Sequence, residues 1–243
     1  MALRSDNVPV FVFRTLFQSQ TQSALHFARC TTAACTQTER RILQSAAGTN
    51  VFHWPSLAVA PGAHPILAYT HSNNFQLAIC GSANCDPVTV RTLYSWSNSA
   101  QARGSGLSMA ILANSQPVLA HYSRSDGVLV TTCTNPSCTA FTHVQIAADG
   151  DNLPALQLRS DGRPGVVYYD RAAKTIDYVV CGSADCSTVQ SRATVASVSD
   201  LPGLVEEIGF ALDASDRPRI AHAIGSSYDL VYRTCSTASC LNE

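Results

Sequence analysis

The sequence has almost no excess charge of either sign and none of the short motifs that mark nucleotide chemistry. Its 243 residues hold 16 Lys and Arg against 17 Asp and Glu, a formal net charge of −1 at pH 7. Apart from the stretch TERRIL, no basic run is interleaved with aromatic residues, so nucleic acid is not expected as a partner. Dinucleotide fingerprints, phosphate loops, HExxH and GxSxG are absent as well. No cofactor is therefore expected.

Long apolar runs and helical patterns are also missing. No run approaches the roughly 20 apolar residues of a membrane helix, so no membrane span is expected. No stretch shows a sustained helical period with caps, which disfavours helical repeats. The opening MALRSDNVPV has no charged segment followed by an apolar core, so no signal peptide is apparent. We expect a mature domain of a secreted precursor, with a cytoplasmic protein as the alternative.

What the sequence does contain is ten cysteines, all of them in C-x4-C units. The first cysteines follow one another at steps of 50, 53, 48 and 54 residues, and a period in this range is typical of a propeller or a solenoid. The five units are Cys30/Cys35, Cys80/Cys85, Cys133/Cys138, Cys181/Cys186 and Cys235/Cys240.

Each unit also has a proline upstream of its first cysteine, followed by a short apolar run such as PILAY or PGVVY. A second run leads into the first cysteine, a third follows the second cysteine, and a fourth precedes the proline. Four short antiparallel strands per repeat are the blade of a β-propeller. The sequence predicts one all-β domain, a five-bladed β-propeller over residues 1–243. The blades are expected at about 1–48, 51–98, 105–148, 150–198 and 203–243.

The cysteines of each repeat are expected to bracket the hairpin between its third and fourth strands. Such a gap suits a local disulfide between facing Cβ atoms of the two strands. Zinc is disfavoured, because hairpins of adjacent blades radiate apart and no unit offers two further Cys or His. Free thiols remain as the other alternative. Ten paired cysteines favour an oxidising compartment, and hence a secreted or cell-surface protein.

The repeats resemble a family seen widely in secreted bacterial proteins, whose blades carry P-x-I-x-Y-Y-D followed by C-x4-C. PGVVYYD at 164–170 followed by IDYVVCGSADC is the closest copy, and PILAYTH with LAICGSANC is the next. Such blades are similar to sialidase-type propellers. This sequence lacks the Asp-box of that group, S-x-D-x-G-x-T-W, so sialidase chemistry is not implied.

Propeller ligands usually meet loops between second and third strands and between successive blades. Polar and aromatic residues that we expect there as ligand-binding candidates are His53, Trp54, His71, Trp96, Arg103, His121, Tyr122, Arg124, Tyr169, Asp170 and His222. A competing interpretation is that the residue four places after each proline packs between blades instead. Those residues are Phe13, Tyr69, His121, Tyr168 and His222.

Two further sets of residues could carry chemistry. A carboxylate pair of the kind that glycosidases use is available from Glu206, Glu207, Asp151 and Asp170. Neighbouring strand residues point to opposite faces, however, so at most one of Glu206 and Glu207 faces the channel. Histidines at equivalent positions of different repeats should lie too far apart to share a metal, and none is expected.

Three functional hypotheses remain. The first is a secreted module that binds a glycan or protein through its loop face and one central pocket. The second is a carbohydrate-active enzyme, a glycoside hydrolase or lyase, with a central active site. The third is a structural or adhesive repeat segment without a small-molecule site.

The fifth repeat has no segment for a fourth strand, because only three residues follow Cys240. We expect the ring to close by apolar packing between the first and last blades, and the chain to be a monomer or a weak dimer through the exposed edge. The residues expected at this closure are Met1, Leu3, Phe11 and Phe13 on one side and Phe210, Leu212 and Ile220 on the other.

Overall fold

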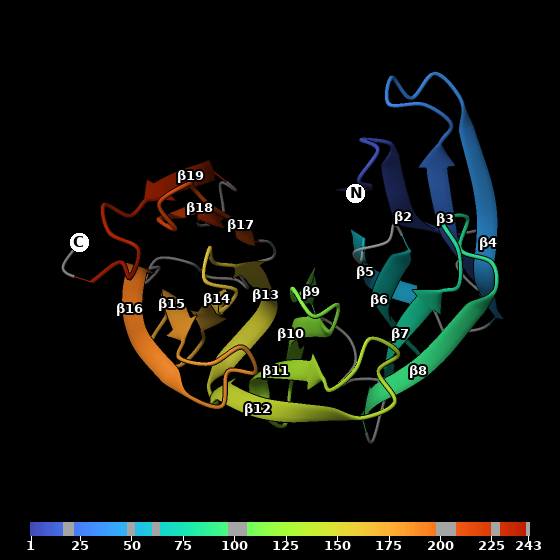
Figure 1. Ribbon diagram of the computed structural model, residues 1–243. Coiled ribbons are helices and arrows are strands. Elements are labelled where there is room, and N and C mark those ends of the chain that lie inside the picture. Colours follow the sequence, from blue (N-terminus) through green and yellow to red (C-terminus); the bar gives the residue numbers. More distant parts are fainter. Residues whose placement is uncertain are drawn as a thin grey trace.

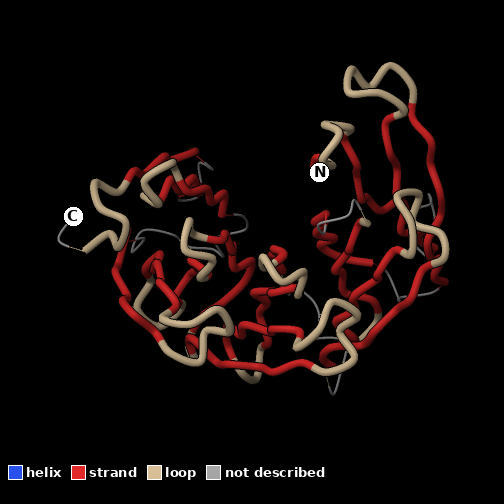
Figure 2. The backbone as a smooth tube through the Cα atoms, in the orientation of Figure 1, coloured by secondary structure: helices blue, strands red, loops and turns tan. Residues whose placement is uncertain are grey.

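The computed structural model describes residues 1–16, 22–47, 52–59, 64–96, 106–197, 208–224 and 229–241. Within these ranges the chain forms strands and turns, without a helix (Figure 2). The first sheet consists of β1 (Ala2–Leu3), β2 (Pro9–Leu16), β3 (Gln22–Cys30) and β4 (Thr38–Ala47). The second consists of β5 (Phe52–Val59), β6 (Pro65–His71), β7 (Asn74–Cys80) and β8 (Val88–Ser95).

The remaining sheets repeat this order along the chain. The third consists of β9 (Leu107–Ile111), β10 (Pro117–Ser123), β11 (Gly127–Cys133) and β12 (Phe141–Ala147). The fourth consists of β13 (Gly150–Leu158), β14 (Pro164–Asp170), β15 (Thr175–Cys181) and β16 (Val189–Ser197). The fifth has three described strands, β17 (Ile208–Leu212), β18 (Pro218–Ile224) and β19 (Asp229–Thr234).

Every sheet is an antiparallel meander, and the sheets follow one another like propeller blades (Figure 1). The last strands, β4, β8, β12 and β16, run along the outside, and the first strands lie on the inside. The predicted all-β, five-bladed architecture is confirmed. The repeated prolines are the first residues of β2, β6, β10, β14 and β18, a position that tolerates the missing N–H of proline.

All five predicted disulfides are present, and no cysteine is free. The expected cross-strand geometry is wrong in one respect, because the second cysteine lies in the turn and not on the fourth strand. Thr38, and not Cys35, is the cross-strand partner of Cys30. Cys35 has a left-handed φ of 52°, and its N–H donates to the carbonyl of Thr32 at 3.0 Å.

The same correction applies to Cys85 and Cys138, which were also expected on fourth strands. The cross-strand partner of Cys80 is Val88, and that of Cys133 is Phe141, so neither second cysteine takes part in the ladder. Cys85 and Cys138 lie in the turns before β8 and β12, with left-handed φ angles of 59° and 47°. The second cysteines of the last two pairs also have a positive φ, so the five turns share one geometry: Cys186 and Cys240.

Burial of these turn cysteines is a second feature that the hairpin prediction missed. Cys85 is fully buried in the cluster between the first and second sheets. Cys138 is 1% exposed and packs in the cluster between the second and third sheets. The turn brings these sulfur atoms, and those of Cys186 and Cys240, back onto the apolar face of the blade, whereas Cys35 is only partly buried. Four of the disulfides are therefore part of the core between blades as well as a local crosslink of one hairpin.

Peptide mapping without reduction is expected to recover five local bridges. Replacing both Cys181 and Cys186 by serine should lower the free energy of unfolding by about 2 kcal/mol, because the bridge closes only a short loop of the unfolded chain. Urea unfolding of this variant beside the parent chain gives the comparison. Bridges between different repeats, or thiols that react freely in most pairs, would contradict the assignment.

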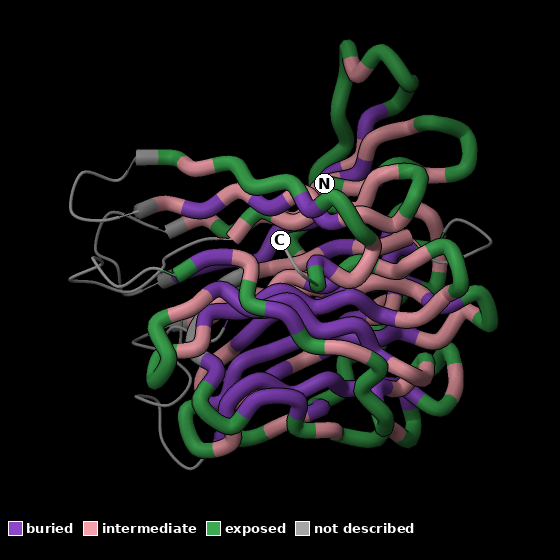
Figure 3. Tube along the Cα trace, turned by 90° about the vertical axis from the view of Figure 1, so that its left-hand side faces the viewer, coloured by how far each residue is buried: buried purple, intermediate pink, exposed green. Residues whose placement is uncertain are grey.

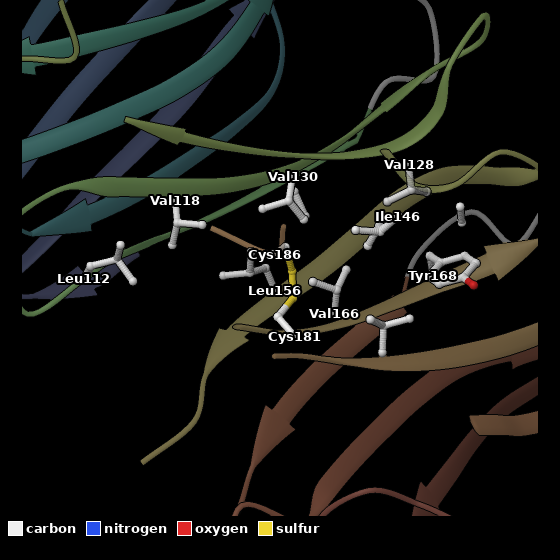
Figure 4. Close-up of a cluster of buried hydrophobic side chains, with 13 residues drawn as sticks. Leu112, Val118, Val128, Val130, Ile146, Leu156, Val166, Tyr168, Cys181 and Cys186 are labelled. Atoms are coloured by element: carbon white, nitrogen blue, oxygen red, sulfur yellow. A yellow bond between two sulfur atoms is a disulfide. The ribbon is translucent and has the colours of Figure 1, made fainter. Parts of the chain in front are cut away.

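The hydrophobic core lies between successive sheets. Between the third and fourth sheets, Val118 and Val130 face Leu156, Val166 and Tyr168 in one buried cluster (Figure 4). Comparable clusters join the other neighbouring sheets. Buried residues therefore run along the strands, while most turn residues other than the cysteines are exposed (Figure 3). Burial of these apolar faces is the main force that holds one blade to the next.

The expected contact between the first and last blades is not observed. The first strands of successive sheets pack together, β5 against β9, β9 against β13 and β13 against β17, and β5 also packs against β2. Among the described residues, no strand of the fifth sheet packs comparably on the first, and these two sheets stand at the two ends of an open arc (Figure 1). Met1 and Leu3 are 78% and 57% exposed. Their predicted role in closing the ring is therefore wrong.

Candidate functional site

Several predicted site residues lie outside what the structure describes. Arg103, Glu206 and Glu207 belong to segments that are not described. Trp54 and Asp151 lie in β5 and β13, but their side chains are not described. The carboxylate set proposed for catalysis is thus represented by Asp170 alone. Asp170 Oδ1 accepts a hydrogen bond of 2.8 Å from the N–H of Ala173, which stabilises the turn after β14.

Two predicted aromatic residues of the loop face are buried in cores between blades. Trp96 packs in the cluster between the second and third sheets, and its ring meets Tyr94 edge to face at 5.4 Å. Tyr169 packs in the cluster between the fourth and fifth sheets. Neither ring presents an open face on which a sugar could stack, so alanine at Tyr169 should disturb folding as well as any binding.

His121 is a buried member of a polar chain in the third blade. Its Nε2 lies 2.9 Å from Thr131 Oγ1, and that oxygen lies 2.7 Å from Nδ1 of His143. Phe75 and Tyr94 of the second blade pack on the His121 ring at 4.8 and 5.6 Å. Burial is the main cause that lowers the pKa of His121 to about 3. The ring is therefore neutral and structural.

Tyr69 and Tyr168, two of the other residues four places after the prolines, also contact the preceding blade. The hydroxyl of Tyr69 donates to Oε1 of Gln44 in the preceding blade at 2.9 Å, and burial raises the pKa of this phenol. Arg192 donates to the hydroxyl of Tyr168 and to the carbonyl of Ile146 in the preceding blade. His222 is buried, with its Nδ1 3.2 Å from the carbonyl of Ala223. Packing between blades thus accounts for Tyr69, His121 and Tyr168, whereas the described contact of His222 lies within its own blade.

His53 and His71 lie at the junction of the first two blades. Nη1 of Arg14 donates to the carbonyl of Phe52 at 2.8 Å and lies 3.0 Å from Nδ1 of His53. The His71 ring stacks on Phe52 at 4.6 Å, and burial lowers its pKa. Both histidines are partly buried and serve contacts within the protein.

Two predicted residues, Tyr122 and Arg124, meet in a pocket of about 320 Å³ on the expected loop face. Tyr122 lies near the end of β10, Arg124 lies in the following turn, and Arg171 lies in the corresponding turn of the next blade. Asp149, between β12 and β13, completes the polar lining. The N–H of Arg171 donates to the carbonyl of Asp149 at 3.1 Å, which fixes one turn against the other. Ala148, Gly150 and Ala172 supply the remaining walls.

We call this pocket the Arg124/Arg171 pocket. Its described lining contains two arginines and one aspartate, and the side chain of Arg124 makes no ion pair or hydrogen bond with any described residue. Gly150 allows the third and fourth blades to approach closely, because a Cβ there would lie 2.5 Å from Cγ2 of Val128. Sequence reasoning missed Asp149 and Arg171. The signal available for Arg171 was its place directly after the strand PGVVYYD.

A second pocket, of about 300 Å³, lies where the inner strands β9, β13 and β17 approach one another. Leu153 lies on its wall in a left-handed conformation with φ of 48°, at a break in the register between β13 and β14. The lining contains no charged residue among those described: Leu107, Ser108, Leu153, Pro154, Ala155, Ile208 and Gly209. This central position has no described acid or base for catalysis.

The described ranges contain no group of three or more His, Cys, Asp or Glu placed to hold a metal ion. They also contain no helix that is long and apolar enough to cross a membrane. Five disulfides suggest that the protein folds in an oxidising setting.

No family profile and no curated protein matches the sequence. Solved structures do match the fold. A protein of unknown function from Dyadobacter fermentans superposes with a TM-score of 0.66 at 8% identity, over 99% of this chain and 78% of the other. An exo-β-1,3-galactanase from Clostridium thermocellum gives 0.56 at 9%, over 98% and 59%. A polysaccharide lyase, an ulvan lyase, gives 0.57 at 8%, over 98% and 66%. At such identities the likeness establishes a β-propeller fold that glycoside hydrolases and lyases share, and no activity.

Proposed function

We propose that the protein is a secreted or cell-surface β-propeller that binds a glycan carrying an acidic group in the Arg124/Arg171 pocket. The observation that supports this proposal is a pair of arginines from adjacent blades, with one carboxylate among the described residues that line the same pocket. Guanidinium groups are the side chains best suited to a carboxylate or sulfate, because they can bind two of its oxygens in parallel.

The size and setting of the pocket fit this ligand. At about 320 Å³ it lies at the lower end of the range for small-molecule sites, which suits one or two sugar units rather than a folded protein surface. Tyr122 is 8% exposed and contributes an edge of the wall and not a stacking face, and Asp149 supplies an acceptor for sugar hydroxyls. The galactanase and the ulvan lyase that share the fold act on polysaccharides, which supports a glycan as the ligand class.

The cellular location is proposed on separate grounds. Ten cysteines in five bridges are typical of proteins that fold outside the reducing cytosol. The resemblance of PGVVYYD and its following CGSADC to blades of secreted bacterial proteins points the same way.

Alanine at Arg124 or Arg171 is expected to weaken binding of an acidic oligosaccharide at least tenfold, because each charge-assisted contact contributes about 1.5–3 kcal/mol. Isothermal titration with oligogalacturonate and with a sulfated galactan oligosaccharide measures the effect. Arg163→Ala is the matched control, since Arg163 pairs with Asp161 in the turn at the opposite end of β14. Equal binding by both pocket variants and the parent chain would refute the proposal.

The same incubations separate binding from catalysis. Release of reducing ends, or of unsaturated products that absorb in the ultraviolet, would favour the glycoside hydrolase or lyase alternative. A binding module is expected to leave the oligosaccharide intact, because Asp149 is the only carboxylate among the described residues that line the pocket.

A further inference from the structure

The two ends of the arc carry apolar faces that every internal blade buries. Residues five and three places before the first cysteine form one such face on each third strand. In the first four repeats these residues are at most 2% exposed: Leu25, Phe27, Phe75, Leu77, Val128, Val130, Ile176 and Tyr178. In the fifth repeat the equivalents, Leu230 and Tyr232, are 77% and 62% exposed. We call this pair the tail face.

The internal junctions show what normally covers a tail face. Tyr178 of the fourth blade packs with Phe210 and Ile220 of the fifth, and its ring lies 5.7 Å from that of Phe210. Leu25 and Phe27 of the first blade pack in the same way with the second blade. Each third strand thus presents its apolar face to the first and second strands of the next blade.

The first blade presents the matching surface with no described residue of another blade packed on it. The residue two places after the proline is fully buried in four repeats, at Leu67, Leu119, Val166 and Ile220. Its equivalent in the first repeat, Phe11, is only partly buried, and Met1 and Leu3 beside it are 78% and 57% exposed. We call Met1, Leu3 and Phe11 the head face. Head and tail are therefore the two halves of an interface that the chain builds four times internally.

We propose that the tail face of one molecule binds the head face of a second copy of this chain. The occupant follows from the molecule itself, because the head face carries the same kind of apolar residues, at the same repeat positions, as the surfaces that cover the four internal tail faces. Closure within one chain would require the packed internal junctions to bend, and close-packed cores resist such deformation. The contact is heterologous, so copies add head to tail.

The fifth sheet also leaves a strand edge for the incoming copy. β3, β7, β11 and β15 each pair with a fourth strand, whereas β19 pairs only with β18 in the described chain. An open edge beside an exposed apolar face adds backbone hydrogen bonds to the side-chain contact.

Sedimentation velocity at rising protein concentration tests the association. The weight-average mass of the parent chain should rise to at least twice the 25.9 kDa of one copy. Tyr232→Arg should abolish this rise from the tail side and Leu3→Asp from the head side. Val90→Asp is the control, because Val90 is 42% exposed on the outer strand β8 of the second blade, which carries neither face, and this variant should associate like the parent.

A mixing experiment distinguishes this contact from others. Tyr232→Arg keeps an intact head face and Leu3→Asp keeps an intact tail face, so an equimolar mixture should form a complex of two chains and stop there. Circular dichroism and melting of each variant verify that it folds. A parent chain that stays monomeric, whether open or closed on itself, overturns the proposal. A mixture that fails to associate also overturns it, and so does a control variant, Val90→Asp, that loses association to the same extent.

Discussion

Replacing Tyr178 by alanine is expected to lower the free energy of unfolding by about 3–5 kcal/mol, the range for large aromatic residues in cores. The side chain is fully buried between the fourth and fifth blades. Its ring packs on Phe210, and Nη1 of Arg159 donates to its hydroxyl at 3.3 Å. Gly165 lies against the ring, since a Cβ there would stand 2.8 Å from the hydroxyl oxygen. Alanine would remove this packing and leave a cavity at the junction.

The repeat supplies an internal control for this experiment. Tyr232 is the same residue type at the same position of the fifth repeat, but it is 62% exposed. Tyr232→Ala should change the stability of the dilute protein by less than about 1 kcal/mol, as substitutions at exposed positions usually do. Urea unfolding of both variants at low concentration gives the comparison. Equal losses would show that the fifth blade is covered in solution and the arc closed.

The strands were predictable because each repeat contains residues that mark the strand boundaries. Proline starts the second strand, and the first cysteine ends or directly follows the third, so the register of the repeat could be counted from Pro164 or Cys181 alone. Closure of the ring was not predictable in this way. It depends on the angle between neighbouring blades, which is set by how side chains such as Tyr178 and Phe210 fit together.

The place of the second cysteine could be predicted only in part. The C-x4-C spacing indicates a short loop and a local bridge, and both are confirmed. The same spacing does not tell whether the second cysteine pairs in the ladder or turns back in a left-handed conformation, as Cys85 and Cys138 do. That choice depends on the backbone hydrogen bonds of the turn, in which the N–H of Cys138 donates to the carbonyl of Asn135 at 3.0 Å.

The candidate site was predictable only in part, for a related reason. Tyr122 and Arg124 were found because polar residues follow the second strand of a blade. Asp149 and Arg171 join them because two turns from different blades are held together by a backbone hydrogen bond. Alternation along a strand tells which face a residue such as Tyr169 occupies, but not whether the next blade covers that face.

Acidification is expected to destabilise the protein at a pH above the range in which carboxylates titrate. The pKa of His121 is about 3 in the folded protein, below the 6.5 of a free histidine, and burial is the main cause. The neighbouring His143 lowers this pKa further, and Asp126 raises it slightly. Below about pH 6.5 the unfolded chain therefore binds a proton that the folded chain does not. The free energy of unfolding consequently decreases as the pH is lowered.

The size of the effect follows from the width of this window. Each pH unit between the two pKa values costs about 1.4 kcal/mol, so His121 alone should remove about 2–3 kcal/mol between about pH 6.5 and about pH 4.5. Burial lowers the pKa of His71, His143 and His222 as well, and this adds to the loss of stability on acidification. Asp126 and Asp213 have pKa values held below the usual range by hydrogen bonds, so their contribution is lost only at lower pH.

Urea unfolding at a series of pH values measures this slope, and His121→Phe identifies its source. Phenylalanine keeps a ring between Phe75 and Tyr94 and cannot titrate, while Thr131 keeps its contact with His143. The variant should lose stability at neutral pH, because Thr131 loses one of its two partners, yet its stability should fall less steeply as the pH is lowered. The dependence of the unfolding free energy on pH therefore separates the titration of the His121 ring from its packing and hydrogen bonding. If parent and variant lose stability in parallel between about pH 6.5 and about pH 4.5, the buried imidazole is not the group that titrates, and proton uptake must occur at other histidines of the blade junctions.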